Sequence, residues 1–233
     1  MSKIYLIRHG ESQANVDKRL HLNLPDHEIA LSSRGIDQAK EAARQLRNKF
    51  TSVYGYSWAH MTLWNSPYRR TRDTAKIIYD TLYEQGHDLI NYHAHVHCKE
   101  NIFLCEQQFG LFDGLEDNEI EAKFPAEYKT WNLCKRFNGK FWARYPMGES
   151  PFDAAIRISQ SFDTFKQGNN IIVAHGAVIK LFLMMWFGRP PEWFNEEKTI
   201  GNCGIHLIEY DRPSGCSEEK IIFNGFKDGQ LIC

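Results

Sequence analysis

Two short apolar runs, each followed by a histidine and a glycine, are the most distinctive pattern in the chain. Residues 4–7 (IYLI) precede Arg8-His9-Gly10, and residues 171–174 (IIVA) precede His175-Gly176. Uninterrupted apolar runs of this length are typical of strands that are buried on both faces of a parallel sheet. A third run, residues 61–64 (MTLW), ends at Asn65-Ser66-Pro67. We therefore predict three central strands, each ending in polar residues.

Helical periodicity predicts several helices that cover this sheet. From Ser33, apolar residues recur three and four positions apart, at Ile36, Ala39, Ala43, Leu46 and Phe50. Further helices are predicted over 68–84, over 177–187, and over 151–168 with the apolar stripe Phe152, Ile156, Ser159, Phe162 and Phe165. An acidic amphipathic segment over 116–134 is interrupted at Pro125, and residues 205–210 and 220–223 suggest a closing hairpin.

Strands that alternate with helices predict the α/β class with a mostly parallel central sheet. The 233 residues contain no internal repeat, low-complexity tract or linker, so residues 1–233 are expected to form a single domain.

Composition narrows the classes of partner. The net charge is −1 and no Lys/Arg run exceeds two residues, so neither nucleic acid nor an anionic membrane is an expected partner. The longest apolar stretch, residues 177–188, contains Lys180 and is too short to span a bilayer. The N-terminus shows no signal-peptide pattern, and the cysteines show no CxxC or zinc spacing. We therefore expect reduced thiols and a cytoplasmic location.

The ends of the three predicted strands carry an unusual set of cations. Parallel strands end at the same edge of a sheet, so Arg8, His9, Arg70 and His175 are expected to converge there. Arg70 also belongs to a cluster with Arg69 and Arg72 at the start of a predicted helix, where cations oppose the helix dipole. Such a cluster repels itself unless an anion joins it, and planar guanidinium groups match phosphate oxygens. The sequence thus indicates a phosphate-binding site.

A second histidine cluster, His93, His95 and His97, falls on a strand predicted between Leu89 and Cys98. A period of two places the three on one face, where they could bind a metal. No carboxylate stands at ligand spacing, so a solvated strand face is favoured and no metal site is predicted.

Taken together, these motifs resemble the histidine phosphatase superfamily, in its phosphoglycerate-mutase-like branch. The resemblance covers nearly the whole chain and rests on Arg8-His9-Gly10-Glu11-Ser12 with Asn15, Leu31-Ser32-x-Arg34-Gly35-x-x-Gln38-Ala39, Ser66-Pro67-x-x-Arg70-x-x-x-Thr74-Ala75, Glu106-x-x-Phe109-Gly110, Gly148-Glu149-Ser150 and His175-Gly176. It implies a three-layer sandwich, with helices on both faces of the sheet.

The resemblance also implies a role for each site residue. His9 would be the nucleophile that forms a phosphohistidine, its other ring nitrogen fixed by a backbone carbonyl. The residues that would grip the phosphoryl oxygens are Arg8, Asn15, Arg70 and His175. Glu106 would be the general acid and base, a task that suits a carboxyl with a raised pKa. Neither a metal nor another cofactor is implied.

Departures from the mutase pattern favour a phosphatase that hydrolyses a small-molecule phosphate monoester. Leu24-Pro25 replaces Thr-Gly, and Gln107, Phe109 and Asp117 stand where similar mutases carry Arg, Tyr and Lys. Lys135, Arg136 and Arg144 are candidates for binding a second anionic group. The alternatives are a phosphoglycerate mutase that depends on 2,3-bisphosphoglycerate and a non-catalytic module that binds phosphorylated ligands. A homodimer is left open.

Overall fold

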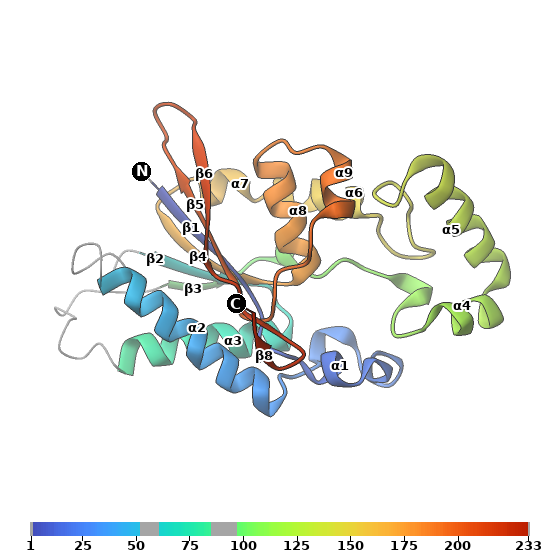
Figure 1. Ribbon diagram of the computed structural model, residues 1–233, viewed down its shortest axis with the longest axis horizontal. Helices are drawn as coiled ribbons and strands as arrows, with labels where there is room; N and C mark the ends of the chain where they lie inside the picture. Colours follow the sequence, from blue (N-terminus) through green and yellow to red (C-terminus); the bar gives the residue numbers. More distant parts are fainter. Residues whose placement is uncertain (1, 52–60, 85–96, 233) are drawn as a thin grey trace.

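The computed structural model of the protein describes residues 2–51, 61–84 and 97–232, and its centre is a six-stranded sheet (Figure 1). The spatial order of the strands is β3-β2-β4-β1-β5-β6. Their bounds are β1 Ser2–Arg8, β2 Met61–Asn65, β3 His97–Glu100, β4 Asn169–Ala174, β5 Ile205–Tyr210 and β6 Ser217–Phe223. The first four strands in this order run parallel, and β5 and β6 are antiparallel to their neighbours. The prediction of a mostly parallel sheet is therefore confirmed.

Helices cover both faces of the sheet, as expected for a three-layer sandwich (Figure 1). On one face lie α2 (Ser33–Thr51) and α3 (Arg69–Glu84), which pack on Tyr5 and Ile7 of β1. On the other face lie α6 (Pro151–Ser159), α7 (Phe162–Phe165), α8 (Gly176–Trp186) and α9 (Pro191–Glu196). Since Ile4 and Leu6 pack on that second face, the apolar run of β1 is buried on both sides.

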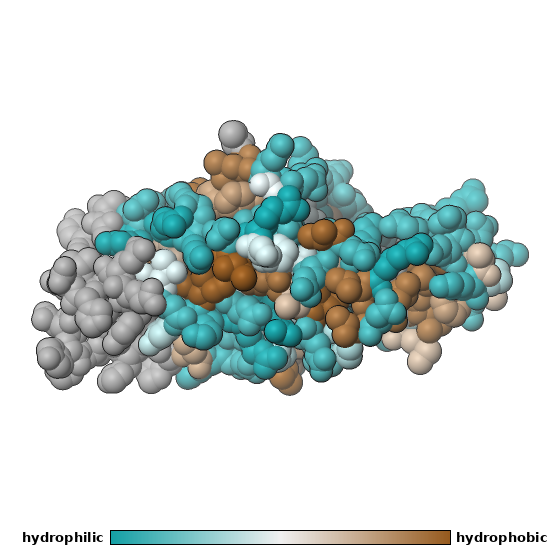
Figure 2. Space-filling model, turned by 90° about the horizontal axis from the view of Figure 1, so that it is seen from below, coloured by the Kyte–Doolittle hydropathy of each residue, from teal (hydrophilic) through white to brown (hydrophobic). Residues whose placement is uncertain are grey.

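The segment between β3 and α6 extends beyond the sheet and has a small core of its own (Figure 1). It contains the 3₁₀ helices η4 (Ile102–Leu104) and η5 (Gly110–Phe112), followed by α4 (Asp117–Lys123) and α5 (Pro125–Asn138). Its small core is formed by Phe112, Ile120, Trp131 and Ala143. Figure 2, which views the molecule from below, shows a largely hydrophilic face with separate apolar areas, some of them toward the end that α4 and α5 form.

Two element predictions are corrected. The helix expected over 151–168 is two helices, because α6 ends at Ser159 and a new helix begins at Phe162. Its buried face consists of the small residues Ala154 and Ala155 with Ile158, whereas Phe152 and Ile156 are 37% and 42% exposed. Small side chains allow α6 to approach its neighbours closely, and the stripe of large residues concealed this. Ile36 of α2 is likewise exposed. Most of the strand expected between Leu89 and Cys98, with His93 and His95, lies outside the described residues, and β3 is described over His97–Glu100.

A narrow neck closes the excursion that follows β1. Ser12 and Leu31 form an antiparallel bridge, and the Gln13 amide donates to the Ala30 carbonyl at 2.9 Å. The excursion between them holds α1 (Gln13–Val16), η1 (Lys18–Leu22) and η2 (Asp26–Glu28). Beside the neck the backbones of Gly10 and Gly35 touch, because a Cβ on Gly10 would lie 2.4 Å from the Gly35 carbonyl oxygen. A Cβ on Gly35 would likewise lie 2.0 Å from the Glu11 carbonyl oxygen.

Two short strands complete the described chain. β7 (Phe226–Lys227) and β8 (Gln230–Leu231) form a small hairpin. Within the described ranges, every helix falls short of the length and apolar character that a membrane span requires.

Candidate active site

The carboxyl ends of β1, β4 and β2 meet at one edge of the sheet. Arg8 of β1 pairs with Ala174 of β4, so His9 and His175 follow at the same level on adjacent strands. The centroids of the two imidazole rings are 5.3 Å apart, and the Tyr68 ring lies 5.0 Å from that of His175. The predicted convergence of the two histidines is thus observed, and it follows from the parallel register of the strands.

His9 is buried and held as one tautomer. Its Nδ1 lies 2.7 Å from the carbonyl oxygen of Gly10, so Nδ1 carries the proton and donates it, and Nε2 keeps a free lone pair. Burial, and then the charges of Arg70 and Arg8, lower the pKa of His9 well below its usual value. The ring is therefore neutral at physiological pH, which is the form that a nucleophile requires.

The loop after His9 is fixed by residues of the sequence motifs that touch no reacting group. The Gly10 amide donates to Thr74 Oγ1 at 3.1 Å, and the Glu11 amide donates to Gln38 Oε1 at 2.8 Å. The Glu11 carboxylate accepts from Ser32 Oγ at 2.7 Å and from Arg34 Nε at 3.1 Å. These side chains hold the backbone that carries His9.

Two guanidinium groups accompany the histidines. Arg8 donates from Nη1 to the Ile200 carbonyl at 2.8 Å, and its buried Nε has no hydrogen-bond partner among the described residues. Arg70, at the start of α3, is 4% exposed and forms a bidentate pair with Asp26, at 2.7 Å from Nη1 to Oδ1 and 3.2 Å from Nη2 to Oδ2. Sequence reasoning missed Asp26, because it comes from η2, outside every motif used. Its carboxylate orients Arg70 and offsets its charge.

Asn15 joins this group from α1. Its Oδ1 accepts from the Ser12 amide at 3.0 Å and from Asn202 Nδ2 at 3.3 Å, so its NH₂ group is left to donate elsewhere. Asn202 also donates to the His9 carbonyl at 3.2 Å and was not predicted. Its amide ties two predicted site residues to the loop before β5.

His175 is fully buried between Ser66 and Glu106. Its Nε2 lies 3.0 Å from Ser66 Oγ, and its Nδ1 lies 3.7 Å from Glu106 Oε2, beyond hydrogen-bond distance. Burial, and then Arg70, lower the pKa of His175 well below its usual value. The ring is therefore neutral, and Nδ1 has no hydrogen-bond partner among the described residues. Buried polar atoms usually have a hydrogen-bond partner, so this nitrogen is available to a bound group.

Glu106 lies in the loop between η4 and η5. One carboxyl oxygen accepts from the Gln107 amide at 3.0 Å. Burial raises the pKa of Glu106 to about 7, against the opposing charge of Arg70, and Asp26 adds to the rise. The carboxyl group can therefore hold or release a proton near neutral pH.

The loop of Glu106 depends on a pair that sequence reasoning did not single out. Glu149 stands in the Gly148-Glu149-Ser150 motif without an assigned role, and Arg157 lies in α6. Arg157 Nε and Glu149 Oε1 are 2.9 Å apart. Nothing in the local sequence marks Arg157, because its partners on the loop come from about fifty residues earlier in the chain.

The three candidates for a second anionic site have partners of their own. Arg144 Nη2 donates to Asp153 at 2.6 Å. Lys135 lies 4.8 Å from the centroid of the Trp131 ring, and Arg136 lies 5.7 Å from that of Phe137. Two of these charges thus lie on α5 and the third lies between α5 and α6, and the structure gives no support to the predicted second site.

One group of described side chains has the geometry to hold a metal ion. The ligand atoms of His21, Asp26 and Asp113 lie within 4.8 Å of one another. His21 Nδ1 is 3.4 Å from Asp26 and 3.5 Å from Asp113, and contact with Asp113 raises the pKa of His21. Asp26 already accepts from Arg70, so an ion-pair network accounts for the arrangement without a metal.

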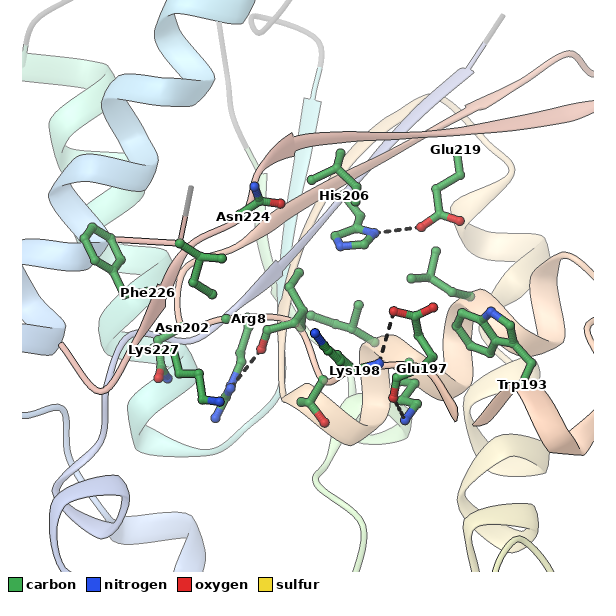
Figure 3. A pocket seen from close by; sticks show the side chains of 18 of the residues that line it. Arg8, Trp193, Glu197, Lys198, Asn202, His206, Glu219, Asn224, Phe226 and Lys227 are labelled. Carbon is green, nitrogen blue, oxygen red and sulfur yellow. Dashed lines mark hydrogen bonds and ion pairs between the residues drawn. The ribbon is translucent and has the colours of Figure 1, made fainter. Parts of the chain in front are cut away.

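A cavity of about 1140 Å³ adjoins the cationic end of the site (Figure 3). Arg8 and Asn15 line it together with Lys180, Trp193, Lys198 and Asn202. Across the cavity His206 Nδ1 contacts Glu219 at 2.7 Å (Figure 3). The lining includes two of the predicted phosphate-binding residues but not His9, Arg70, Glu106 or His175.

Comparison with known proteins places this arrangement in context. The profile of the histidine phosphatase superfamily (branch 1) matches residues 4–218. The phosphoglycerate mutase-like protein AT74 of Arabidopsis thaliana is 30% identical over 221 residues, and AT74H from the same plant is 30% identical over 225 residues. Each alignment covers 89% of this chain, with 64% of AT74 and 73% of AT74H. Fructose-2,6-bisphosphatase of Saccharomyces cerevisiae is 28% identical over 81% of this chain and 35% of its own length.

Solved structures share the fold. The alpha-ribazole phosphatase of Shigella flexneri matches with a TM-score of 0.68 at 20% identity, covering 94% of this chain and 95% of its own. A mycobacterial glucosyl-3-phosphoglycerate phosphatase matches with a TM-score of 0.66 at 21% identity, covering 95% and 98%. The profile match over most of the chain, the relatives and the shared fold together show that this protein belongs to the histidine phosphatase superfamily, a family of phosphatases and mutases.

Proposed function

We propose that this protein is a phosphatase that hydrolyses phosphate monoesters of small molecules through a phosphohistidine on His9. The observation that carries the proposal is the pairing of two groups beside His175. His9 is neutral with Nε2 free, and the Glu106 carboxyl has a pKa of about 7. Transfer of a phosphoryl group to a side chain requires a nucleophile with a free lone pair and an acid that holds a proton at the same pH.

In the first step, His9 Nε2 attacks phosphorus and the bond from phosphorus to the ester oxygen breaks. Glu106, in its protonated form, gives its proton to the departing oxygen, so a neutral alcohol leaves. In the second step the Glu106 carboxylate takes a proton from water, which attacks the phosphohistidine. Inorganic phosphate leaves, and both His9 and Glu106 return to their starting forms.

The charge of the transferred group is met by the cationic edge of the site. Arg8, Arg70, Asn15 and His175 are proposed to donate to the phosphoryl oxygens, supplying the stabilisation that metal ions provide in other phosphoryl-transfer enzymes. Nε of Arg8 and Nδ1 of His175 are buried and have no hydrogen-bond partner in the described parts of the chain, which supports this assignment. The proposal requires no metal or other cofactor.

A phosphatase is favoured over a phosphoglycerate mutase that depends on 2,3-bisphosphoglycerate. Arg144 is paired with Asp153, and Asp117 begins α4 where similar mutases carry a lysine. The relatives that are named for a substrate act on different compounds, so the alcohol part of the substrate is not carried over from them. A binding module without activity is disfavoured, because the site contains both a neutral His9 and a carboxyl with a raised pKa.

The proposal also covers the setting of the enzyme. We treat residues 1–233 as one domain that acts in the cytoplasm, without nucleic acid or membrane partners. The cysteines at 98, 105, 134, 203 and 216 are free, which fits a reducing compartment.

The test is hydrolysis of p-nitrophenyl phosphate by wild type and by His9→Ala, with acid-quenched trapping of labelled phosphohistidine. A phosphatase gives turnover and a labelled wild-type enzyme, and the variant gives neither. A coupled assay with 2,3-bisphosphoglycerate tests the alternative. Isomerisation of phosphoglycerate that outruns hydrolysis would identify a mutase, and hydrolysis by His9→Ala at the wild-type rate would contradict the proposal.

A further inference from the structure

One ion pair holds the loop that carries Glu106. Arg157 of α6 and Glu149 meet through two parallel contacts, Nε to Oε1 and Nη2 to Oε2, both 2.9 Å long. Each side chain is 21% exposed. A bidentate pair of this kind fixes the plane and direction of the guanidinium group.

The same guanidinium group binds the backbone before Glu106. Arg157 Nη1 donates to the carbonyl of Phe103 at 2.8 Å and to that of Cys105 at 3.0 Å, and Nη2 lies 3.4 Å from the Glu106 carbonyl. These carbonyls lie in and just after a single 3₁₀ turn. Carbonyl groups in irregular backbone have no partner in a helix or a strand. The Arg157 side chain therefore supplies the hydrogen bonds that hold this stretch of the loop.

Glu149 binds the backbone after Glu106. Its Oε2 accepts from the Gln108 amide at 3.1 Å, and its own amide donates to the Gln108 carbonyl at 2.8 Å. Gln107 Nε2 donates to the Glu149 carbonyl at 3.3 Å. The two backbones touch at Gly148, where a Cβ would lie 2.4 Å from the Gln108 carbonyl oxygen. The loop is therefore held on both sides of Glu106.

We propose that Glu149 and Arg157 are positioning residues, which set the place of the Glu106 carboxyl relative to the phosphoryl group. This inference rests on the proposed role of Glu106 as acid and base. The groups that act on that carboxyl come from other elements. They are Arg8 of β1, Arg70 of α3, Asp26 of η2 and His175 after β4. A shift of the loop changes the distance from Glu106 to each of them, and with it both proton transfer and the pKa of Glu106.

The test is Arg157→Lys, with Glu149→Gln as a second variant. Lysine keeps the charge but cannot make the bidentate pair and bind several carbonyls at once. We expect kcat for an alkyl ester, glycerol phosphate, to fall by about 10- to 100-fold, because a displacement of about 1 Å in a catalytic group costs up to about 100-fold. KM should change by less than about threefold, because phosphate binding is separate. Hydrolysis of p-nitrophenyl phosphate should fall much less, because its leaving group needs little protonation.

The pH profile gives a readout that a merely structural role would not move. The descending limb of kcat for glycerol phosphate, set by Glu106 near pH 7 in wild type, should shift in both variants. Lys166→Gln is the control, since it breaks an exposed ion pair with Asp163 of α7 and should leave all four readouts unchanged. Circular dichroism and Tm verify folding. If Arg157→Lys unfolds, Glu149→Gln still tests the proposal, because glutamine has the shape of glutamate and the backbone hydrogen bonds of residue 149 are kept.

Comparison with Glu106→Gln separates the two proposals. When Glu106→Gln selectively impairs the alkyl ester and Arg157→Lys adds little to it in the double variant, positioning through Glu106 is supported. If Glu106→Gln shows that selectivity but Arg157→Lys and Glu149→Gln lose alkyl and aryl hydrolysis equally, or lose neither, the positioning role is wrong. If Glu106→Gln itself shows no selectivity, the role of Glu106 fails, and the inference fails with it.

Discussion

The residues around His9 and those around Glu106 are held in place by different means. His9, Arg8 and His175 stand at the ends of neighbouring parallel strands, so the hydrogen-bonded register of the sheet sets their spacing. Glu106 stands in a loop outside the sheet, where the contacts of the Glu149–Arg157 pair replace a strand ladder. A parallel sheet can thus place the phosphate-binding groups, whereas the acid needs a support of its own.

The largest effect is expected on the strand side of this comparison. His9→Ala removes the attacking nitrogen, so kcat should fall by at least about 10⁴-fold and labelled phosphohistidine should disappear. Rapid-quench labelling measures both. His27→Ala, which alters an exposed histidine, is the control and should retain the wild-type rate. If the His9→Ala protein were still labelled by the substrate phosphate, the nucleophile would be another residue.

The loop side is expected to show a loss that depends on the leaving group. Glu106→Gln should lower kcat for glycerol phosphate by about 10²- to 10⁴-fold and affect p-nitrophenyl phosphate far less. In wild type, kcat for the alkyl ester should fall as pH rises through about 7, because the raised pKa keeps Glu106 protonated only below that value. Glu100→Gln is the control on an exposed carboxylate. Equal losses with both esters would remove Glu106 from the role of acid.

An intermediate effect is expected for Arg70, which belongs to the strand side but is oriented by η2. Arg70→Lys cannot keep the bidentate pair with Asp26 while facing a phosphoryl group, so kcat/KM should fall by about 10- to 100-fold for alkyl and aryl esters alike. Steady-state kinetics with both esters measure this. Arg69→Lys, at an exposed neighbour on the same helix, should change little. Selective loss of the alkyl ester would mean that Arg70 acts mainly through Glu106.

A smaller effect concerns stability. Because burial raises the folded-state pKa of Glu106, the carboxyl contributes stability below its ordinary pKa, and that contribution is lost as pH rises toward about 7. The Tm of Glu106→Gln minus that of wild type should therefore rise between pH 5 and pH 8 by roughly 5–10 °C, the shift that about 2.5 kcal/mol causes in a domain of this size. Calorimetry at both pH values measures it. A Tm difference that is independent of pH would contradict a raised pKa.

No effect is expected from chelation. Activity in excess EDTA should equal that of untreated enzyme, since the proposed steps use no metal. If chelation abolished activity and a divalent cation restored it, His21, Asp26 and Asp113 would be the first residues to mutate. Such a result would revise how the site meets the phosphate charge, without moving the nucleophile.

The sequence predicts the strand side well and the loop side poorly, for a physical reason. Apolar runs such as 4–7 and 171–174 identify strands buried on both faces, and parallel strands bring their ends together. By contrast, Arg157 meets the carbonyls of Phe103 and Cys105 through tertiary contacts that leave no periodic signal. Asp26 is similar, since its pairing with Arg70 depends on how the excursion after β1 folds back.

Packing explains the remaining errors in the fold. In α6 the helix faces its neighbours through Ala154 and Ala155, so residue size misled the assignment of the buried face. The split after Ser159 likewise has no strong sequence signal, because neither glycine nor proline stands there. The start of this helix, by contrast, is marked by its cap, since the Asp153 amide donates to Ser150 Oγ at 3.1 Å.

The neck formed by Ser12 and Leu31 has a consequence for how such enzymes diversify. Backbone hydrogen bonds at the neck join the two ends of the excursion. The close packing of Gly10 and Gly35 beside the neck fixes His9 independently of the residues within the excursion. Insertions, deletions or grafted sequences between residues 17 and 28 can therefore be accommodated without moving the reacting nitrogen. Because Asp26 lies in that stretch and orients Arg70, an exchange that keeps Asp26 is a route to new substrate preferences on unchanged chemistry.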